Sequence, residues 1–219
     1  MDIRNLKLVI FDMDGLMFDT ERYYFKSVKE MCEEKKINVN MDAYRSVIGT
    51  SRSIDMDSFN KSGYSNRELD QMIRRQVESV RENFCLRGVP IKKGLLQLLD
   101  TLNKKGIRKV VATSTPFLVT ERLIRSVGLE KEFEFIVTGE EVEKGKPYPD
   151  IFWSACKKAG VSFEKSLVLE DSVPGAMAAS AAGIPYIIVP DINAPSDEIA
   201  QKAVMIAESL IDVDKMICS

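Results

Sequence analysis

The sequence contains no histidine among its 219 residues. Without imidazole, a Ser-His-Asp or Cys-His triad, a histidine-ligated metal site and a phosphohistidine intermediate are all excluded. Any catalysis by this chain must therefore use carboxylates, lysine, hydroxyls, thiols or a bound metal ion.

Cysteine is scarce, and a strong excess of one charge is missing. The four cysteines lie far apart without a CxxC pair, which predicts reduced thiols in a cytosolic protein. The 33 acidic and 31 basic side chains give a net charge of -2, so nothing indicates a nucleic-acid partner. No apolar run approaches the ~18 residues of a membrane span, and no signal-peptide core is visible. We therefore expect a cytoplasmic protein, monomeric by default, that binds neither nucleic acid nor membrane.

Short apolar runs alternate along most of the chain with helical patterns. Because the runs are continuous rather than alternating, they predict strands that are buried on both faces of a parallel sheet. The alternation predicts an α/β fold with a doubly wound, Rossmann-like sheet. The predicted strands are residues 7–11, 109–113, 135–138, 167–169, 186–189 and 203–206, and the predicted helices are residues 92–105, 117–127, 150–159 and 174–182.

Residues 17–87 break this alternation, because they contain no convincing strand and have the pattern of several helices. Thr20 is predicted to cap a helix over residues 21–35, and a second long helix is predicted from residue 65 or 66 to about residue 84. A helical insertion directly after the first strand predicts a cap over the end of that strand. The expected domains are a core of residues 1–16 and 88–219 and a cap of residues 17–87.

Polar side chains follow the predicted strands where each strand ends. In open α/β sheets, ligands bind beyond the carboxyl ends of the strands. We therefore expect these side chains to form one site. They are Asp12 and Asp14 with Gly15 after the first strand, Thr113, Ser114 and Thr115 after the second, Lys146 in the loop past the third, and Glu170 and Asp171 after the fourth.

The acidic residues of this set predict a metal site. Asp12, Glu170 and Asp171 would form an oxygen-rich cluster that repels itself unless a cation lies among them. Hard oxygen ligands without histidine or cysteine favour Mg²⁺. The structural alternative for Asp171 is the N-cap of the helix predicted to begin at Pro174.

Lys146 lies in a Gly-Lys-Pro sequence that a phosphate-binding P-loop does not explain. Five residues rather than four separate Gly139 from Gly145, and Pro147 stands where Ser or Thr is required. Lys146 is therefore either an exposed loop lysine or a charge positioned in the site.

The hydroxyl of Thr113, with free amides of Ser114 and Thr115, could be directed at a phosphate oxygen, or Thr113 could simply end its strand. Taken together, two acids, a cation, a lysine and a cradle of hydroxyls and amides are the components of phosphoryl transfer.

With these motifs, the sequence resembles the haloacid dehalogenase superfamily of phosphohydrolases, in the branch that has a helical cap after the first strand. The first signature runs Asp-Met-Asp-Gly-Leu-Met-Phe-Asp-Thr-Glu from Asp12 to Glu21. Thr113, Lys146 and the Glu170-Asp171-Ser172 segment follow in the family order. The resemblance covers about residues 6–190, including the cap, and implies a phosphoric monoester hydrolase.

The resemblance also implies roles for individual residues. Asp12 would be the nucleophile that forms an aspartyl-phosphate, and Asp14 the general acid and base. Mg²⁺ would be held by Asp12, the main-chain carbonyl of Asp14 and Asp171, with Glu170 nearby. Thr113 and Lys146 would bind the phosphoryl group of a small phosphorylated metabolite, such as a sugar phosphate.

A sugar-phosphate mutase of the β-phosphoglucomutase type is the alternative function. Gly49-Thr50-Ser51-Arg52 resembles a turn in the mutase cap, so Arg52 could grip a substrate phosphate, or it could be a solvated arginine at a helix start. The mutase cap also carries a histidine where this chain has Tyr24, which cannot replace imidazole near neutral pH. Arg52 and Tyr24 are the expected cap contacts with substrate, and Tyr24 favours the phosphatase.

Overall fold

The computed structural model describes residues 3–45 and 55–218 of the chain. Within these residues, six strands form one sheet in which every neighbouring pair is parallel. The strands are β1 (Leu8–Phe11), β2 (Arg108–Thr113), β3 (Ile136–Thr138), β4 (Ser166–Glu170), β5 (Tyr186–Ile188) and β6 (Met205–Ile206). Their order in the sheet is β3-β2-β1-β4-β5-β6, so the doubly wound α/β fold predicted from the sequence is confirmed.

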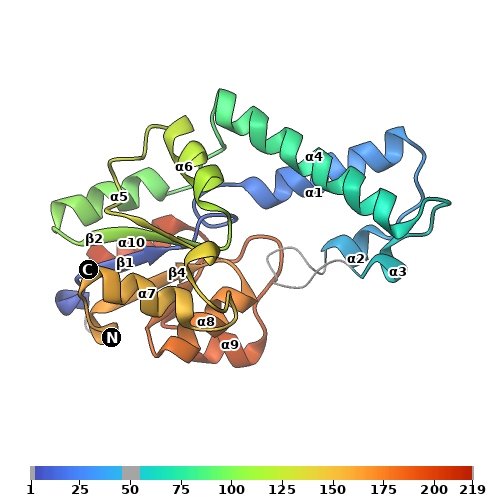
Figure 1. The fold of residues 1–219 in the computed structure, drawn as a ribbon. Helices are drawn as coiled ribbons and strands as arrows, with labels where there is room; N and C mark the ends of the chain where they lie inside the picture. The colour runs from blue at the N-terminus through green and yellow to red at the C-terminus, as the bar shows by residue number, and fades with distance from the viewer. Residues whose placement is uncertain (1–2, 46–54, 219) are drawn as a thin grey trace.

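Helices cover both faces of this sheet (Figure 1). One face packs against α5 (Leu95–Lys104), α6 (Phe117–Ser126) and α10 (Leu210–Cys218). The opposite face packs against α7 (Asp150–Ala159), α8 (Val173–Ala182) and α9 (Asp197–Lys202). Three short 3-10 helices, η1 (Ile3–Asn5), η2 (Gly139–Glu141) and η3 (Phe163–Lys165), complete this part of the chain.

The continuous apolar sequence of β1 is explained by this two-sided packing. Val9 and Phe11 belong to the core on the α5, α6 and α10 side. Leu8 and Ile10 belong to the core on the α7 and α8 side, and all four side chains are fully buried. Since alternate residues of a strand face opposite sides, both faces must be apolar when both are covered.

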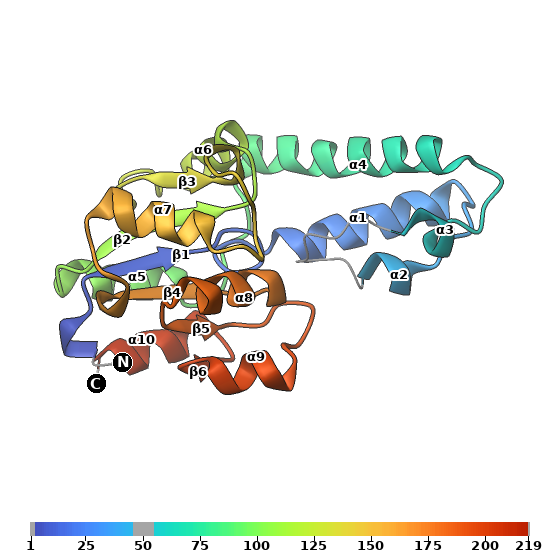
Figure 2. The same ribbon diagram turned by 60° about the horizontal axis from the view of Figure 1, so that its bottom comes forward.

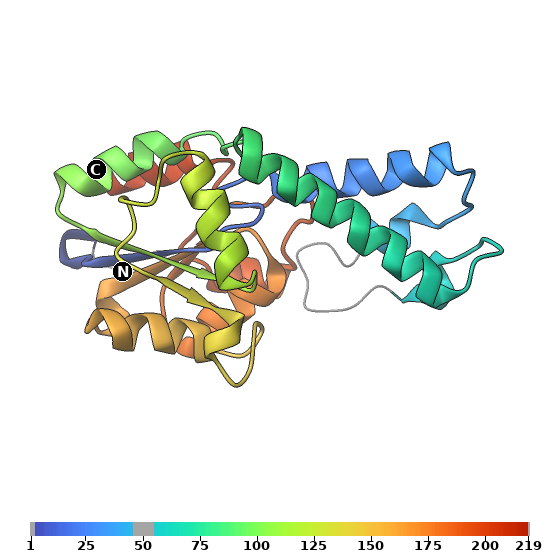
Figure 3. The same cartoon turned by 45° about the horizontal axis from the view of Figure 1, so that its top comes forward.

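Between β1 and α5, the described residues form four helices and no strand, and these helices extend away from the sheet (Figures 2 and 3). In Figure 2 the long helices α1 and α4 run side by side, with α2 and α3 near their far end. These helices have an apolar cluster of their own that includes Val28, Phe59 and Leu69. The helical content confirms the secondary structure predicted for this segment, while the division into two domains stays a prediction. The helices are α1 (Thr20–Glu34), α2 (Met41–Arg45), α3 (Met56–Phe59) and α4 (Asn66–Arg87).

The predicted elements are present, with ends shifted by a few residues. One correction concerns Thr20, which does not cap the helix that follows it: α1 begins at Thr20 itself, and the residue before it makes no capping bond through its side chain. Ser65 does cap α4, where it forms a capping box with Glu68. Two helices, α9 and α10, were not predicted from the sequence.

Two further observations concern the whole chain. The four cysteines are free thiols, as expected. No helix in residues 3–45 or 55–218 has the length and apolar character needed to cross a membrane.

Candidate active site

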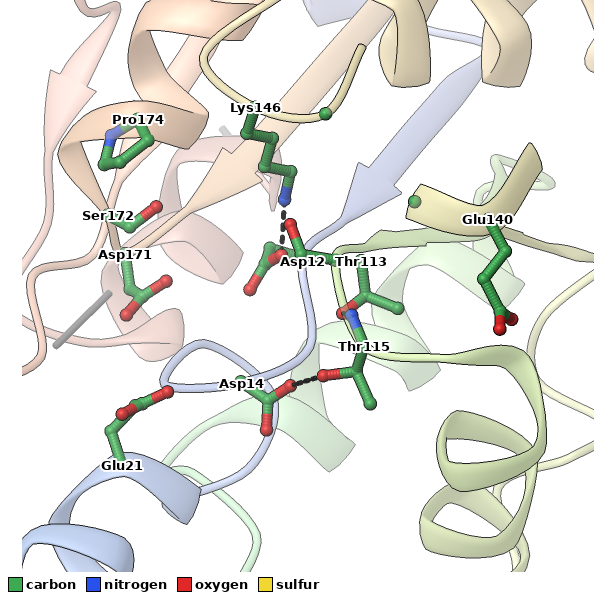
Figure 4. Close-up of a pocket in the computed structure, with 13 residues that line it drawn as sticks. Asp12, Asp14, Glu21, Thr113, Thr115, Glu140, Lys146, Asp171, Ser172 and Pro174 are labelled. Atoms are coloured by element: carbon green, nitrogen blue, oxygen red, sulfur yellow. Dashed lines mark hydrogen bonds and ion pairs between the residues drawn. The ribbon is translucent and has the colours of Figure 1, made fainter. Parts of the chain in front are cut away.

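A cavity of about 420 Å³ opens at the carboxyl ends of β1, β2 and β4. Figure 4 shows side chains from all three strands, from the first turn of α1 and from the loop before α7 converging on it. The cavity therefore lies at the edge of the sheet where the sequence predicted a site. Its lining consists of Asp12, Asp14, Glu21, Thr113, Ser114, Thr115, Gly139, Glu140, Gly145, Lys146, Asp171, Ser172 and Pro174.

Lys146 is the only cation in the described part of this lining, and it is buried. Its ammonium group donates to Asp12 Oδ1 at 2.5 Å and to Glu170 Oε1 at 2.6 Å. A third donated bond, 3.1 Å long, reaches the carbonyl of Ala112 in β2. The three donated bonds reach the residue after β1, a residue of β4 and a residue of β2, and they hold the ammonium in one place. Lys146 is therefore a positioned charge and not an exposed loop lysine.

The second oxygen of Glu170 accepts three hydrogen bonds from the turn that starts α8. The amides of Asp171 and Ser172 donate at 3.1 and 3.2 Å, and the Ser172 hydroxyl donates at 2.9 Å. The cap of α8 is Ser172, whose hydroxyl oxygen accepts from the Gly175 amide at 3.2 Å. The alternative in which Asp171 caps this helix is therefore wrong, and its carboxylate remains available to the cavity.

Two glycines allow the acidic residues to approach so closely. Gly15 has a φ of +80°, and a Cβ at this position would overlap a carboxylate oxygen of Asp171. A Cβ at Gly175 would overlap the carboxylate of Glu170. Only glycine fits at these two positions, so the backbone here is shaped around the carboxylates.

Asp12, Glu170 and Asp171 bring one carboxylate oxygen each to within 4.8 Å of one another, and all three residues are buried. Burial raises the pKa of Asp12 well above its usual range, against the attraction of Lys146. Burial, together with the charges of Asp12 and Glu170, also raises the pKa of Asp171. Burial lowers the pKa of Lys146, but the two carboxylates outweigh it and hold that pKa above its ordinary value. The site therefore disfavours the charged forms of both aspartates, because one buried lysine faces three buried carboxylates.

Asp14 is separate from this cluster and is held by two hydroxyl groups. Thr20 Oγ1 donates to Asp14 Oδ1 at 2.7 Å, and Thr115 Oγ1 donates to Asp14 Oδ2 at 2.6 Å. The Thr20 hydroxyl comes from the first residue of α1. The Thr115 hydroxyl comes from the chain after β2, and Figure 4 shows its bond to Asp14. The Asp14 carboxyl group is thus fixed at the edge of the cavity, beside the buried cluster.

Thr113 ends β2, and its side chain is buried in the cavity wall. Its hydroxyl oxygen accepts the amide of Thr115 at 3.1 Å, which leaves the hydroxyl proton free to be donated. The amide of Thr115, expected to be free, is therefore already bonded, and that expectation is wrong. A phosphate contact of the Thr113 hydroxyl stays a prediction. Ser114 is exposed and lies in the lining.

Two residues expected to contact substrate are not in this lining. Tyr24 is buried, accepts a 3.3 Å hydrogen bond from Arg81, and has the Arg81 guanidinium over its ring at 5.4 Å. Burial and the charge of Asp14 raise its pKa above the usual value for tyrosine. Arg52, with the turn at residues 49–52, lies outside the described residues. The role of each in substrate binding stays a prediction.

Other lining residues were not identified from the sequence. Glu21 lies within the first signature, but the sequence indicates no role for it. Glu140 and Ser172 are further lining residues that the sequence does not identify. Glu21 directly follows Thr20, whose contact with Asp14 brings the first turn of α1 to the cavity. The sequence did contain a signal for this residue. Glu21 is the last residue of the first signature and the first residue of the helix predicted over residues 21–35.

Comparison with protein families identifies the family of the chain. The profile of the family described as haloacid dehalogenase-like hydrolase matches residues 9–189. That span contains the three carboxylates of the acidic cluster, together with Lys146 and Asp14. The resemblance expected from the sequence motifs is confirmed.

Individual relatives agree with the family match. The chain is 31% identical over 192 residues to the phosphorylated carbohydrates phosphatase of Thermotoga maritima. The aligned residues are 86% of this chain and 88% of that protein. It is 29% identical over 185 residues to the β-phosphoglucomutase of Bacillus subtilis, with 82% and 81% covered. The solved structure of CbbY from Rhodobacter sphaeroides in complex with phosphate has the same fold, with a TM-score of 0.71, 23% identity, and 95% and 96% of the two chains covered.

Proposed function

Because the chain belongs to the haloacid dehalogenase-like hydrolase family, we propose that it is a Mg²⁺-dependent phosphatase of a small phosphorylated carbohydrate. The enzyme class itself, a phosphoric monoester hydrolase, follows from the family and its relatives. The observation that carries the rest of the proposal is the buried cluster of three carboxylates around Lys146.

The residues of this cluster fit a divalent cation. Three carboxylates and one ammonium group leave a formal charge of -2 in a buried site. The Asp171 carboxylate has no hydrogen bond or ion pair of its own among residues 3–45 and 55–218. Oxygen ligands alone favour Mg²⁺. Asp12 and Asp171 would hold the ion with the main-chain carbonyl of Asp14. Glu170 would lie beside the ion, because both of its carboxylate oxygens already accept hydrogen bonds. A bound Mg²⁺ would supply positive charge against the phosphoryl oxygens.

The reaction would begin at Asp12. Lys146 occupies its Oδ1 atom, so the second carboxylate oxygen attacks phosphorus and forms an aspartyl-phosphate. The bond from phosphorus to the ester oxygen breaks, and that oxygen takes the proton of Asp14. Asp14 then removes a proton from water, which attacks phosphorus and releases phosphate from Asp12.

The remaining lining residues would bind the transferring group. Lys146 is close enough to Asp12 to contact a phosphoryl group bound there, and the free hydroxyl proton of Thr113 can be donated to one of its oxygens. The ammonium group also limits repulsion between the phosphate and the carboxylates around it. We assign Ser114 and Thr115 to the same binding wall.

Residues 17–87 are proposed to act as a cap domain that covers the cavity and selects the leaving group. Arg52 and Tyr24 stay predicted substrate contacts. The named activity of the Thermotoga relative supports a phosphorylated carbohydrate as the substrate class. A cytoplasmic, monomeric enzyme without a nucleic-acid partner also stays a prediction.

The mutase alternative is not favoured. The chain has no histidine, and Tyr24, at the expected histidine position, uses its hydroxyl oxygen to accept a bond from Arg81. Burial raises the pKa of this phenol above the usual value for tyrosine, so its side chain cannot shuttle a proton near neutral pH.

A panel of sugar phosphates assayed for released inorganic phosphate, with and without Mg²⁺, tests the proposal. The unsubstituted enzyme should release phosphate only with the metal, and Asp12→Asn should remove turnover while the circular dichroism spectrum stays unchanged. Continued phosphate release by the folded Asp12→Asn variant would exclude Asp12 as nucleophile. Isomerisation of a hexose 1-phosphate without net phosphate release would instead establish the mutase.

A further inference from the structure

Glu21 is an acidic residue of the cavity that the proposed chemistry does not use. It lies in the first turn of α1, directly after the residue whose hydroxyl donates to Asp14 at 2.7 Å. In Figure 4 its carboxyl group points into the cavity, toward Asp14 and Asp171. Glu21 therefore faces the reacting groups from the helical segment, on the side where the leaving group must lie.

The carboxyl group of Glu21 has no hydrogen bond or ion pair with any residue in the described part of the chain. It is also not one of the three carboxylates close enough together to share a metal ion. The other glutamate of the lining, Glu140, accepts the amide of Phe117 at 2.9 Å, and in Figure 4 its carboxyl group points away from Asp12. Of these two glutamates, only Glu21 presents an unused polar group to the interior.

The surroundings of Glu21 favour a role as a hydrogen-bond acceptor for a bound ligand. Burial, reinforced by the charges of Asp14 and Asp191 and opposed by Arg81, raises its pKa to about 8. A carboxyl group has an oxygen that accepts a hydrogen bond in both protonation states. A partly buried polar group without a partner is costly, and a ligand hydroxyl can remove that cost.

We propose that Glu21 is a specificity-determining residue, which accepts hydrogen bonds from hydroxyl groups of a polyol leaving group. This inference rests on the proposed phosphatase function and adds a requirement to it. A phosphate ester whose leaving group lacks hydroxyls would leave Glu21 unpaired, and such a mismatch is penalised more strongly than a loss of apolar contact.

Two pairs of substrates isolate this contribution. Glycerol 3-phosphate is compared with n-propyl phosphate, and sorbitol 6-phosphate with n-hexyl phosphate, so that each pair has one chain length with and without hydroxyls. For each enzyme, kcat/KM of the hydroxylated ester is divided by kcat/KM of its alkyl partner. Glu21→Ala should lower this ratio about tenfold or more in at least one pair. Glu21→Gln, which keeps an accepting oxygen, should retain most of the ratio.

The ratio separates specificity from general damage. A variant that merely disturbs the helical segment lowers both values in a pair and leaves their ratio unchanged. Glu140→Ala is the matched control, because it removes a carboxylate from the same cavity, and its ratio should equal that of the unsubstituted enzyme. An unchanged ratio in Glu21→Ala, or an equal fall in Glu140→Ala, would overturn the inference. So would a Glu21→Gln ratio as low as that of Glu21→Ala. If the unsubstituted enzyme hydrolyses none of the four esters and no sugar phosphate, the proposed function itself fails.

Discussion

Replacing Lys146 by methionine should destabilise the protein as well as inactivate it. The substitution keeps much of the side-chain volume but removes the ammonium group that donates to Asp12 at 2.5 Å and to Glu170 at 2.6 Å. Both carboxylates are buried, so neither can turn to water in compensation. Removal of one partner from a buried ion pair costs about 3–5 kcal/mol.

This cost can be measured by thermal unfolding in the absence of metal. For a chain of this size each kcal/mol lowers the melting temperature by about 2–4 °C, so Lys146→Met should lose about 6–20 °C. The loss should shrink as the pH falls. Burial already raises the pKa of Asp12 in the folded state, and removal of the ammonium raises it further, so the folded variant binds a proton more tightly than the unfolded chain. Its stability therefore rises as the pH decreases toward the ordinary carboxyl range.

Lys109 provides the matched control. It is also a buried lysine, and it forms a 3.1 Å ion pair with Glu132, far from the cavity. The Glu132 side chain is 29% exposed, so its charge remains partly hydrated when the lysine is removed. Lys109→Met should therefore cost less stability, about 1 kcal/mol, and should leave phosphatase activity intact. A melting temperature of Lys146→Met within ~2 °C of the unsubstituted protein, or a larger loss in Lys109→Met, would refute the reasoning.

Three further substitutions test the surroundings of the cluster. Asp171→Asn should raise the Mg²⁺ concentration needed for half-maximal activity about tenfold or more, and an unchanged metal titration would remove it from the metal site. Thr115→Val removes one of the two hydroxyls that hold Asp14, so kcat should fall about fivefold to tenfold with a shifted pH profile and little change in KM. Gly15→Ala should destabilise the fold by about 1–3 kcal/mol in urea unfolding, because its φ is +80° and a Cβ there would overlap Asp171.

The fold was predictable because strands that are buried on both faces have continuous apolar sequences. All four residues of β1 are apolar, and all four are fully buried. The two missed helices are short. In α10 the buried residues Leu210, Val213 and Ile217 do have helical spacing, but nine residues are too few for periodicity alone to distinguish a helix.

The site was predictable to the extent that it depends on strand ends. The carboxyl ends of parallel strands meet at one edge, so Asp12, Thr113 and Glu170 could be brought together from sequence. The contact of Thr20 with Asp14 could not be predicted from the sequence. It depends on the turn at Gly15, whose amide donates to the Phe18 carbonyl at 2.9 Å and folds the chain back on itself. Local capping preferences predicted that the Thr20 side chain would cap its own helix. In the structure its hydroxyl donates to Asp14 instead.

The same contact explains how a site without histidine can hold its proton-transfer group in position. An imidazole is commonly oriented by a hydrogen bond from one ring nitrogen, whereas both oxygens of Asp14 accept a threonine hydroxyl. Thr20 belongs to α1 of the helical segment and Thr115 follows β2 of the sheet, so the carboxyl group is fully held only while these two parts stay in contact. Since Glu21 is the next residue of α1, the arrangement that fixes Asp14 also brings Glu21 to the leaving-group side of the cavity. The N-terminus of α1 therefore supplies both the residue that orients Asp14 and the residue proposed to select the leaving group.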